Sequence, residues 1–132
     1  MLDHFGLKCR TPEITVPFYE ACLAPLGIRV IERQPAFRAA ILKRDGSPVF
    51  LWIGDGGSEW AATAGGAAMH IGFRADSANA VDAFYVAGIS LGGKDNGPPG
   101  FRRPTCYSAF VFDPEGNNIE AIFQTERPFP GS

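Results

Sequence analysis

The spacing of apolar residues along the chain predicts two helices, each preceded by a short strand. The segments DHFGLK (residues 3–8) and MHIGFR (residues 69–74) are short and mostly apolar, which is typical of strands. After each of them, apolar residues recur three or four positions apart, as on one face of a helix. The two apolar faces consist of Phe18, Cys22, Leu23 and Leu26 in the first helix, and of Val81, Phe84, Tyr85 and Gly88 in the second.

Proline, serine and glycine residues predict where these helices begin and end. Pro12 suits the first turn of the first helix, and Ser77 can cap the second. Gly27 and Gly93 follow the last turns, where glycine is common. Pro17 lacks a backbone donor, so we expect either that the regular helix starts beyond Pro12 or that its first turns are distorted.

The remaining apolar runs predict strands that complete each half of the chain. The segment at 94–104 is rich in glycine and proline, so it is expected to be mostly loop with at most one edge strand. The turn DPEG separates the last two strands. Each half therefore reads strand, helix and up to three strands. The expected strands after the helices are residues 28–33, 37–44 and 48–54 in the first half, and 107–112 and 117–123 in the second.

The two halves repeat one another. A shift of 66 residues places His4 on His70, Gly6 on Gly72, and the aromatic pair Phe18-Tyr19 on Phe84-Tyr85. This indicates a duplicated module. We expect one domain over residues 1–132, with module one at about 1–57, a linker at about 58–67, module two at about 68–126 and a C-terminal tail at 127–132.

Composition narrows the class of protein. The chain has 132 residues, 45% of them hydrophobic, and a net charge of −2 without a basic run, which argues against nucleic acid and anionic membrane as partners. No apolar segment approaches the roughly 20 residues that span a bilayer, and the start does not resemble a signal peptide. Three isolated cysteines without CxxC spacing indicate reduced thiols and a cytoplasmic location.

Strand alternation singles out three residues with metal-ligand chemistry. His4 and His70 project from the faces of their strands opposite the apolar residues, and a glycine beside each leaves space. Glu120 leaves the apolar face of the last strand in the same way. Two imidazoles and one carboxylate suit a divalent metal with open positions. The alternative is that the histidines are hydrogen-bonded structural residues and that Glu120 faces solvent.

Several motifs resemble the vicinal oxygen chelate superfamily, which includes glyoxalase I, extradiol dioxygenases, fosfomycin-resistance enzymes and bleomycin-binding proteins. They are DHFGL, FYEACLAPLG, MHIGF and, most specific of all, FVFDPEGNNIEAI. The resemblance implies an α+β fold of two tandem βαβββ modules whose eight strands form a curled mixed sheet around a cleft. It also implies a homodimer and metal ligands at His4, His70 and Glu120.

The sequence departs from glyoxalase I in its first half. Those proteins carry a fourth ligand, a glutamate, in the last strand of module one. Aligning the turns RDG and PEG sets Phe50 opposite Glu120, and the neighbours of Phe50 include no carboxylate. A true glyoxalase I is therefore disfavoured, and no residue stands out as the catalytic base.

Two functions fit these features. The first is a small enzyme that uses one divalent metal (Fe, Mn, Ni or Zn) as a Lewis acid on a small oxygen-bearing substrate, as a lyase, isomerase or dioxygenase. The second is a metal-free protein that sequesters a drug or another small molecule. In either case the expected pocket residues are Phe50, Trp52, Arg103 and Tyr107, with Arg102 beside them; the alternatives are a solvated loop for the arginines and core positions for the aromatic residues.

Overall fold

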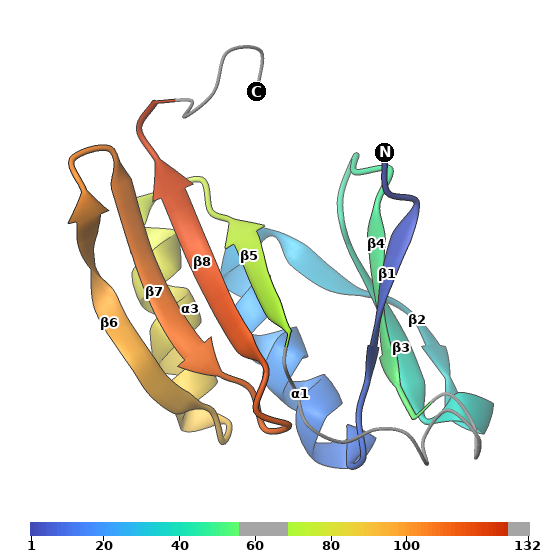
Figure 1. Cartoon of the computed structure of the whole chain (residues 1–132). Coiled ribbons are helices and arrows are strands. Elements are labelled where there is room, and N and C mark those ends of the chain that lie inside the picture. The colour runs from blue at the N-terminus through green and yellow to red at the C-terminus, as the bar shows by residue number, and fades with distance from the viewer. Residues whose placement is uncertain (56–68, 127–132) are drawn as a thin grey trace.

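The computed structural model describes residues 1–55 and 69–126, and these form two βαβββ modules (Figure 1). The predicted linker at 58–67 and tail at 127–132 lie outside the described residues. Module one consists of β1 (His4–Lys8), α1 (Pro12–Leu23), a 3-10 turn (Ala24–Leu26), β2 (Ile28–Gln34), a second 3-10 turn (Pro35–Phe37), β3 (Ala39–Arg44) and β4 (Phe50–Gly54). Module two consists of β5 (His70–Arg74), α3 (Ala78–Ser90), β6 (Lys94–Arg103), β7 (Cys106–Phe112) and β8 (Asn118–Gln124).

The eight strands divide into two four-stranded sheets with the same topology. The first sheet has the order β1-β4-β3-β2 and the second the order β5-β8-β7-β6. In each sheet the strand before the helix pairs in parallel with the last strand of the module, and the other pairs are antiparallel. The predicted duplicated α+β fold is confirmed, and the described strands form two separate sheets that do not close into a barrel.

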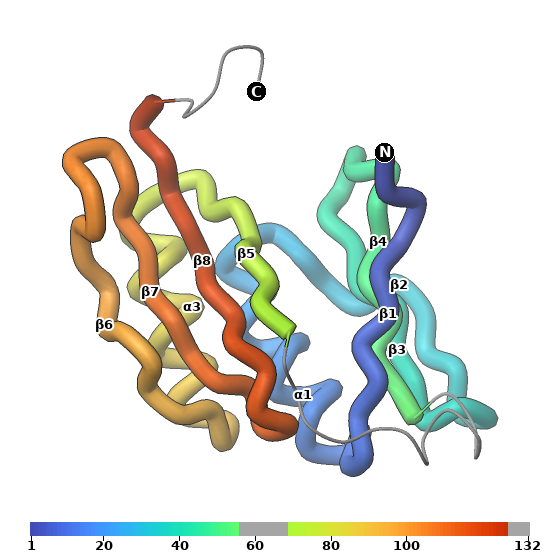
Figure 2. The backbone as a smooth tube through the Cα atoms, in the orientation of Figure 1, coloured from blue at the N-terminus to red at the C-terminus, as the bar shows by residue number. Residues whose placement is uncertain are grey.

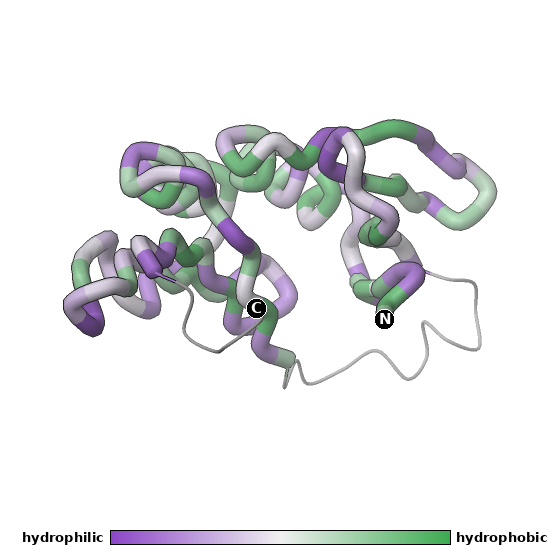
Figure 3. The backbone as a smooth tube through the Cα atoms, turned by 90° about the horizontal axis from the view of Figure 1, so that it is seen from above, coloured by the Kyte–Doolittle hydropathy of each residue, from purple (hydrophilic) through white to green (hydrophobic). Residues whose placement is uncertain are grey.

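The helices join the modules around one apolar core. α3 packs on its own sheet, whereas α1 contacts both α3 and the strands of the first sheet. The modules thus lie side by side, as the views from the front and from above show (Figures 2 and 3). The predicted helical faces are confirmed, because Phe18, Cys22, Leu23, Val81 and Phe84 are completely buried in this core. None of the described helices is long and apolar enough to cross a membrane.

The helix ends differ in part from expectation. α1 begins at Pro12 although it contains Pro17, so the alternative of a later helix start is wrong. Ser77 caps α3 as predicted and accepts a hydrogen bond from the Ala80 amide at 3.1 Å. α3 ends at Ser90. Gly92, with a φ of +96°, is the left-handed residue after α3, and the Gly93 amide donates to the Gly88 carbonyl at 2.9 Å, so the glycine end lies one residue earlier than predicted. A Cβ at Gly93 would lie 2.6 Å from Val111 and 2.8 Å from Phe18. Only glycine allows this close approach.

The glycine- and proline-rich segment forms a complete edge strand, β6, and not mostly a loop. Its pairing with β7 shifts between Asp95 and Gly97, again between Gly97 and Gly100, and once more between Phe101 and Arg103. Prolines are tolerated at such bulged edges because fewer backbone donors are needed there. The glycine and proline content of this segment therefore indicates an irregular strand.

The turn DPEG docks module two onto module one. The Asp113 carboxylate is buried and accepts hydrogen bonds from the Tyr19 hydroxyl of α1, from the amides of Glu115 and Asn117, and from the Asn117 side chain. Burial, together with the neighbouring Asp113 carboxylate, raises the pKa of Tyr19 well above its ordinary value. The turn therefore fixes the start of β8, two residues before Glu120.

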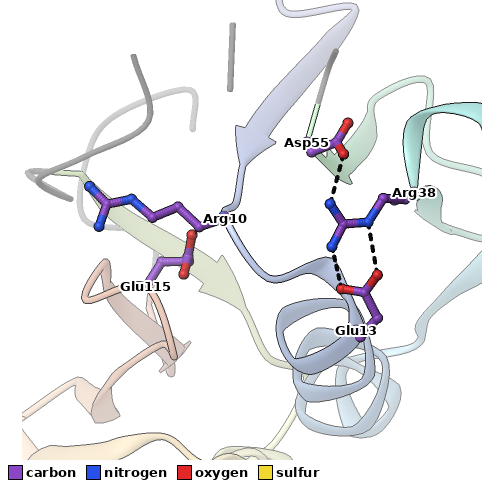
Figure 4. Close-up of polar contacts among 5 residues, drawn as sticks. All are labelled: Arg10, Glu13, Arg38, Asp55 and Glu115. Atoms are coloured by element: carbon purple, nitrogen blue, oxygen red, sulfur yellow. Dashed lines mark hydrogen bonds and ion pairs between the residues drawn. The ribbon is translucent and has the colours of Figure 1, made fainter. Parts of the chain in front are cut away.

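A second polar cluster joins the start of α1 to the end of β4 in module one. The Arg38 guanidinium donates to Glu13 at 2.8 and 2.6 Å and to Asp55 at 3.0 Å, which ties the start of α1 to the end of β4 (Figure 4). The Arg10 amide, at the other side of this region, donates to the Glu115 carboxylate. The paired side chains are largely exposed, apart from Asp55. We therefore regard the cluster as structural.

Candidate metal centre

His70 and Glu120 lie together on the second sheet. The parallel register sets Gly72 beside Glu120, so the glycine leaves the carboxylate uncovered on that side. The His70 Nε2 atom lies 2.9 Å from Glu120 Oε1, and His70 Nδ1 lies 3.1 Å from the Asn118 carbonyl oxygen. Only 14% of the Glu120 side chain is exposed, against 49% of His70. The structure therefore brings these two predicted ligands together on one face of the second sheet.

The hydrogen bonds of His70 suit a metal ligand. A neutral imidazole has one N–H, and the Asn118 carbonyl oxygen at Nδ1 can only accept it. Nε2 then turns a lone pair toward the Glu120 carboxylate. Two atoms that both offer lone pairs need a cation or a proton between them. This donor set fits a divalent metal ion, which would replace the direct contact between His70 and Glu120.

His4 occupies the corresponding place on the first sheet. Its Nδ1 atom lies 2.7 Å from the Asp3 carboxylate, and its ring stacks on Phe50 with 4.8 Å between centroids and 8° between planes. Each histidine therefore uses Nδ1 for an acceptor within the protein. Nε2 of His4 has no hydrogen-bond partner among residues 1–55 and 69–126, and it remains available as a ligand.

The three predicted ligands do not meet within one chain. Among the described residues, no three side chains of histidine, cysteine, aspartate or glutamate form a group that could hold a metal ion. His70 and Glu120 make one part of such a group on the second sheet, and His4 makes a separate part on the first.

The strand register corrects the expected counterpart of Glu120. In the second sheet Gly72 pairs with Glu120, and in the first sheet the equivalent glycine, Gly6, pairs with Trp52. Trp52, not Phe50, therefore stands where a fourth ligand would be. Its indole N–H donates to the Gln34 side chain at 2.9 Å. The conclusion that module one lacks the fourth carboxylate is unchanged.

The structure does not bring the expected pocket residues together on one face. Phe50 and Trp52 share the His4 face of the first sheet. Tyr107 lies on the helix side of the second sheet, where its hydroxyl donates to Asp82 of α3 at 2.6 Å, so it is separated from His70. This contact with Asp82 is the main cause of the raised pKa of Tyr107. Arg103 is exposed at the end of β6, where it pairs with Cys106 of β7.

Phe110 lies beside His70 on the face of the second sheet that carries Glu120, and Arg102 lies beyond Phe110. Phe110 pairs with Glu120 across the strands, and its ring centroid lies 6.2 Å from that of His70. The Arg102 guanidinium lies over Phe110, 5.5 Å from the ring centroid. Alternation with the buried Ala109 and Val111 was the sequence signal that could have placed Phe110 on this face.

Comparison with known proteins places the fold in a family. The chain matches the model of the Glyoxalase/Bleomycin resistance protein/Dioxygenase superfamily over residues 1–121. No curated protein matches.

Solved structures agree with this assignment. A glyoxalase/bleomycin resistance protein from Albidiferax ferrireducens T118 is 29% identical, with a TM-score of 0.75 and coverage of 94% of this chain and 98% of that one. A glyoxalase-related enzyme from Fulvimarina pelagi is 18% identical (TM-score 0.71, coverage 99% and 93%). TnmS3, an antibiotic binding protein from Streptomyces sp. CB03234, is 20% identical (TM-score 0.66, coverage 95% and 96%). With its duplicated βαβββ modules and a family match that spans nearly all of both, the chain belongs to the Glyoxalase/Bleomycin resistance protein/Dioxygenase superfamily.

Proposed function

We propose that the protein is a small metal-dependent enzyme whose divalent ion is held by His4, His70 and Glu120. The observation that carries this proposal is the His70–Glu120 pair, in which two ligand atoms lie 2.9 Å apart while Nδ1 of the histidine is held by a backbone carbonyl. When bound, the ion would act as a Lewis acid on the oxygens of a small substrate. Fe(II), Mn(II), Ni(II) and Zn(II) all suit this ligand set.

The protein side chains would prepare the site for that chemistry. The Asn118 carbonyl holds the His70 ring in one tautomer, and the Asp3 carboxylate does the same for His4. Phe110 and Phe50 pack against the two imidazoles and limit their rotation. Trp52 presents an aromatic surface where a fourth ligand would otherwise lie, which leaves coordination positions for substrate and water.

We further propose that a second copy of the chain completes each site in a cytoplasmic homodimer. Since His4 and the His70–Glu120 pair belong to separate sheets and form no ligand group among the described residues, a partner's first sheet would face the second sheet of this chain. Two such sites would form in a symmetric dimer, because each chain gives one histidine and receives one.

Metal-dependent stability tests the proposal. An ion that binds only the folded protein raises the melting temperature, and the rise grows with the logarithm of the free metal concentration once that concentration exceeds the Kd. We expect Zn(II), Mn(II), Ni(II) or Fe(II) to raise the melting temperature of the chelator-treated wild type. The melting temperature of His70→Ala should not change. An equal response of the two proteins would refute the assigned ligands.

Sequestration of a small molecule without metal is the second candidate. The aromatic side chains Phe50, Trp52 and Phe110, which lie on the same faces as the histidines, favour it. TnmS3, which shares the fold, is an antibiotic binding protein. A melting temperature that no metal changes, together with tight binding of an aromatic cation, would support this candidate over the enzyme.

A further inference from the structure

Arg102 extends the metal-ligand face of the second sheet beyond Phe110. The strand order is β5-β8-β7-β6, so the Phe110 ring on β7 lies between His70 on β5 and Arg102 on β6. The ring centroid is 6.2 Å from that of His70 and 5.5 Å from the Arg102 guanidinium carbon. An aromatic surface therefore connects the candidate ligands to a positive charge.

Backbone carbonyl groups hold the Arg102 guanidinium in place. Its Nη1 atom donates to Gly100 at 3.0 Å and to Ser108 at 2.9 Å, and its Nη2 atom donates to Pro98 at 2.5 Å. These acceptors carry no net charge. They orient the guanidinium without neutralising it, so its charge remains available to a ligand.

Arg102 has no acidic partner in the described part of the chain, whereas four other arginines do. Within the described ranges, no carboxylate lies within ion-pair distance of Arg102. A fixed positive charge beside a candidate active site without a counter-ion is suited to an anionic ligand. The arginines that do form ion pairs are Arg29 with Asp45, Arg33 with Glu20, Arg38 with Glu13 and Asp55, and Arg44 with Asp76.

The irregular sequence of β6 makes room for this arrangement. A Cβ atom at Gly97 would lie 2.9 Å from the Arg102 guanidinium and 3.2 Å from Phe110, and one at Gly100 would lie 3.3 Å from the guanidinium. A side chain at either position would push the guanidinium away. The bulged glycine- and proline-rich strand thus provides the space in which the Arg102 guanidinium lies.

The Ser108 hydroxyl, which has no hydrogen-bond partner among the described residues, belongs to a residue in contact with Arg102. Ser108 lies two residues before Phe110 on β7, so both side chains are on the same face of the sheet. Its hydroxyl is buried and has no hydrogen-bond partner in the described part of the chain, although its carbonyl accepts from Arg102. Unmet hydrogen bonds at a buried hydroxyl are uncommon, which supports a polar ligand at this end of the face.

We propose that Arg102 binds an anionic group of the substrate, a carboxylate or a phosphate-type group, and that the substrate passes over the edge of Phe110 to reach it. The oxygens at the other end of the substrate would face His70 and Glu120. This assignment rests on the proposed function, because it takes that pair as the reacting end. Arg102 is then a specificity-determining residue.

Two probes of equal shape test the proposal. 3,4-Dihydroxybenzoate and 3,4-dihydroxybenzamide both carry vicinal oxygens on a flat ring, but only the first is anionic. In calorimetric titrations of the zinc-loaded protein, we expect the benzoate to bind at least about tenfold more tightly, because only its carboxylate forms a charge-assisted hydrogen bond with Arg102. Arg102→Gln should remove this preference and leave amide binding unchanged. Arg102→Lys should retain part of it.

Arg29→Gln is the control, since it removes an exposed arginine of the first sheet that pairs with Asp45, and it should keep the full preference. If the wild type binds both probes equally or fails to bind the benzoate, or if Arg102→Gln keeps the preference, the proposal is wrong. The wild-type result alone is decisive if Arg102→Gln does not fold.

Metal analysis separates this proposal from the proposed function. Normal zinc content in the wild type and in Arg102→Gln, with no preference between the probes, would overturn the anion site alone. An Arg102-dependent preference in a protein that binds no metal would overturn the metal enzyme and retain the anion site.

Discussion

The Tyr19 hydroxyl donates a hydrogen bond to the buried Asp113 carboxylate and so links the first helix of module one to the last turn of module two. Asp113 also orders the DPEG turn through two backbone amides. Because β8 begins just after this turn, the same contact helps to fix Glu120 beside His70. The most specific motif of the sequence therefore supports the candidate site from outside it.

Removing the hydroxyl in Tyr19→Phe is expected to lower the free energy of unfolding by about 1–3 kcal/mol, because a buried carboxylate loses a hydrogen bond. Chemical denaturation measures this change. Tyr85→Phe is the control: its hydroxyl donates to Asp95 at 3.1 Å near the surface, and the loss should stay within about 0.5 kcal/mol. A loss for Tyr19→Phe that stays within about 0.5 kcal/mol would show that the link between modules is not important for stability.

Stability is expected to fall in alkaline solution. Burial, followed by the nearby Glu115 carboxylate, raises the pKa of Cys9 from 9.0 to about 12. The unfolded chain releases this proton near 9.0 while the folded chain keeps it, so the free energy of unfolding decreases between these two values. Tyr19 and Cys22, whose pKa values are also raised, act in the same direction.

Denaturation midpoints measured across this range should decline with pH, and Cys9→Ala should have a smaller slope than the wild type. A stability that does not change above pH 9.0 would contradict the burial of these groups.

The sequence predicted most of the fold for a physical reason. Periodicity identified both helical faces, and the histidine-glycine repeat revealed the duplication, because each depends on local spacing. β6 was mistaken for a loop because glycine and proline reduce strand propensity, whereas Gly97 and Gly100 leave the space that the Arg102 side chain occupies.

The candidate site was less accessible from the sequence. Tyr107 and Phe110 lie on opposite faces of one strand, and the choice depends on which face α3 covers. The counterpart of Glu120 depends on the register with β1. Turn alignment gave Phe50, whereas the backbone pairing gives Trp52.

That register can be tested by adding a ligand. Trp52→Glu is expected to tighten metal binding by at least about tenfold, because it installs a carboxylate at the position equivalent to Glu120. Phe50→Glu, on the same strand but opposite His4, should not. Competition with a fluorescent chelator measures both affinities. A greater gain for Phe50→Glu would reverse the assignment.

The sharing of sites between two chains predicts complementation. His4→Ala and His70→Ala should each bind no metal alone. Co-expressed with different tags, they should form a heterodimer with about half of the wild-type metal content, since one of its two sites receives both intact histidines. A heterodimer without metal would mean that His4 and His70 of one chain serve the same site, and a monomeric protein would also contradict the shared site.

The most direct test of the central claim is elemental analysis of tag-free protein purified without chelator, beside Glu120→Gln and the control Glu115→Gln. Glu115 is an acidic residue of the DPEG turn outside the ligand set. We expect near-stoichiometric divalent metal in the wild type and in Glu115→Gln, and its loss in Glu120→Gln. Equal metal content in all three proteins, or none in the wild type after incubation with Fe(II), Mn(II), Ni(II) and Zn(II), would contradict a metal centre at His4, His70 and Glu120.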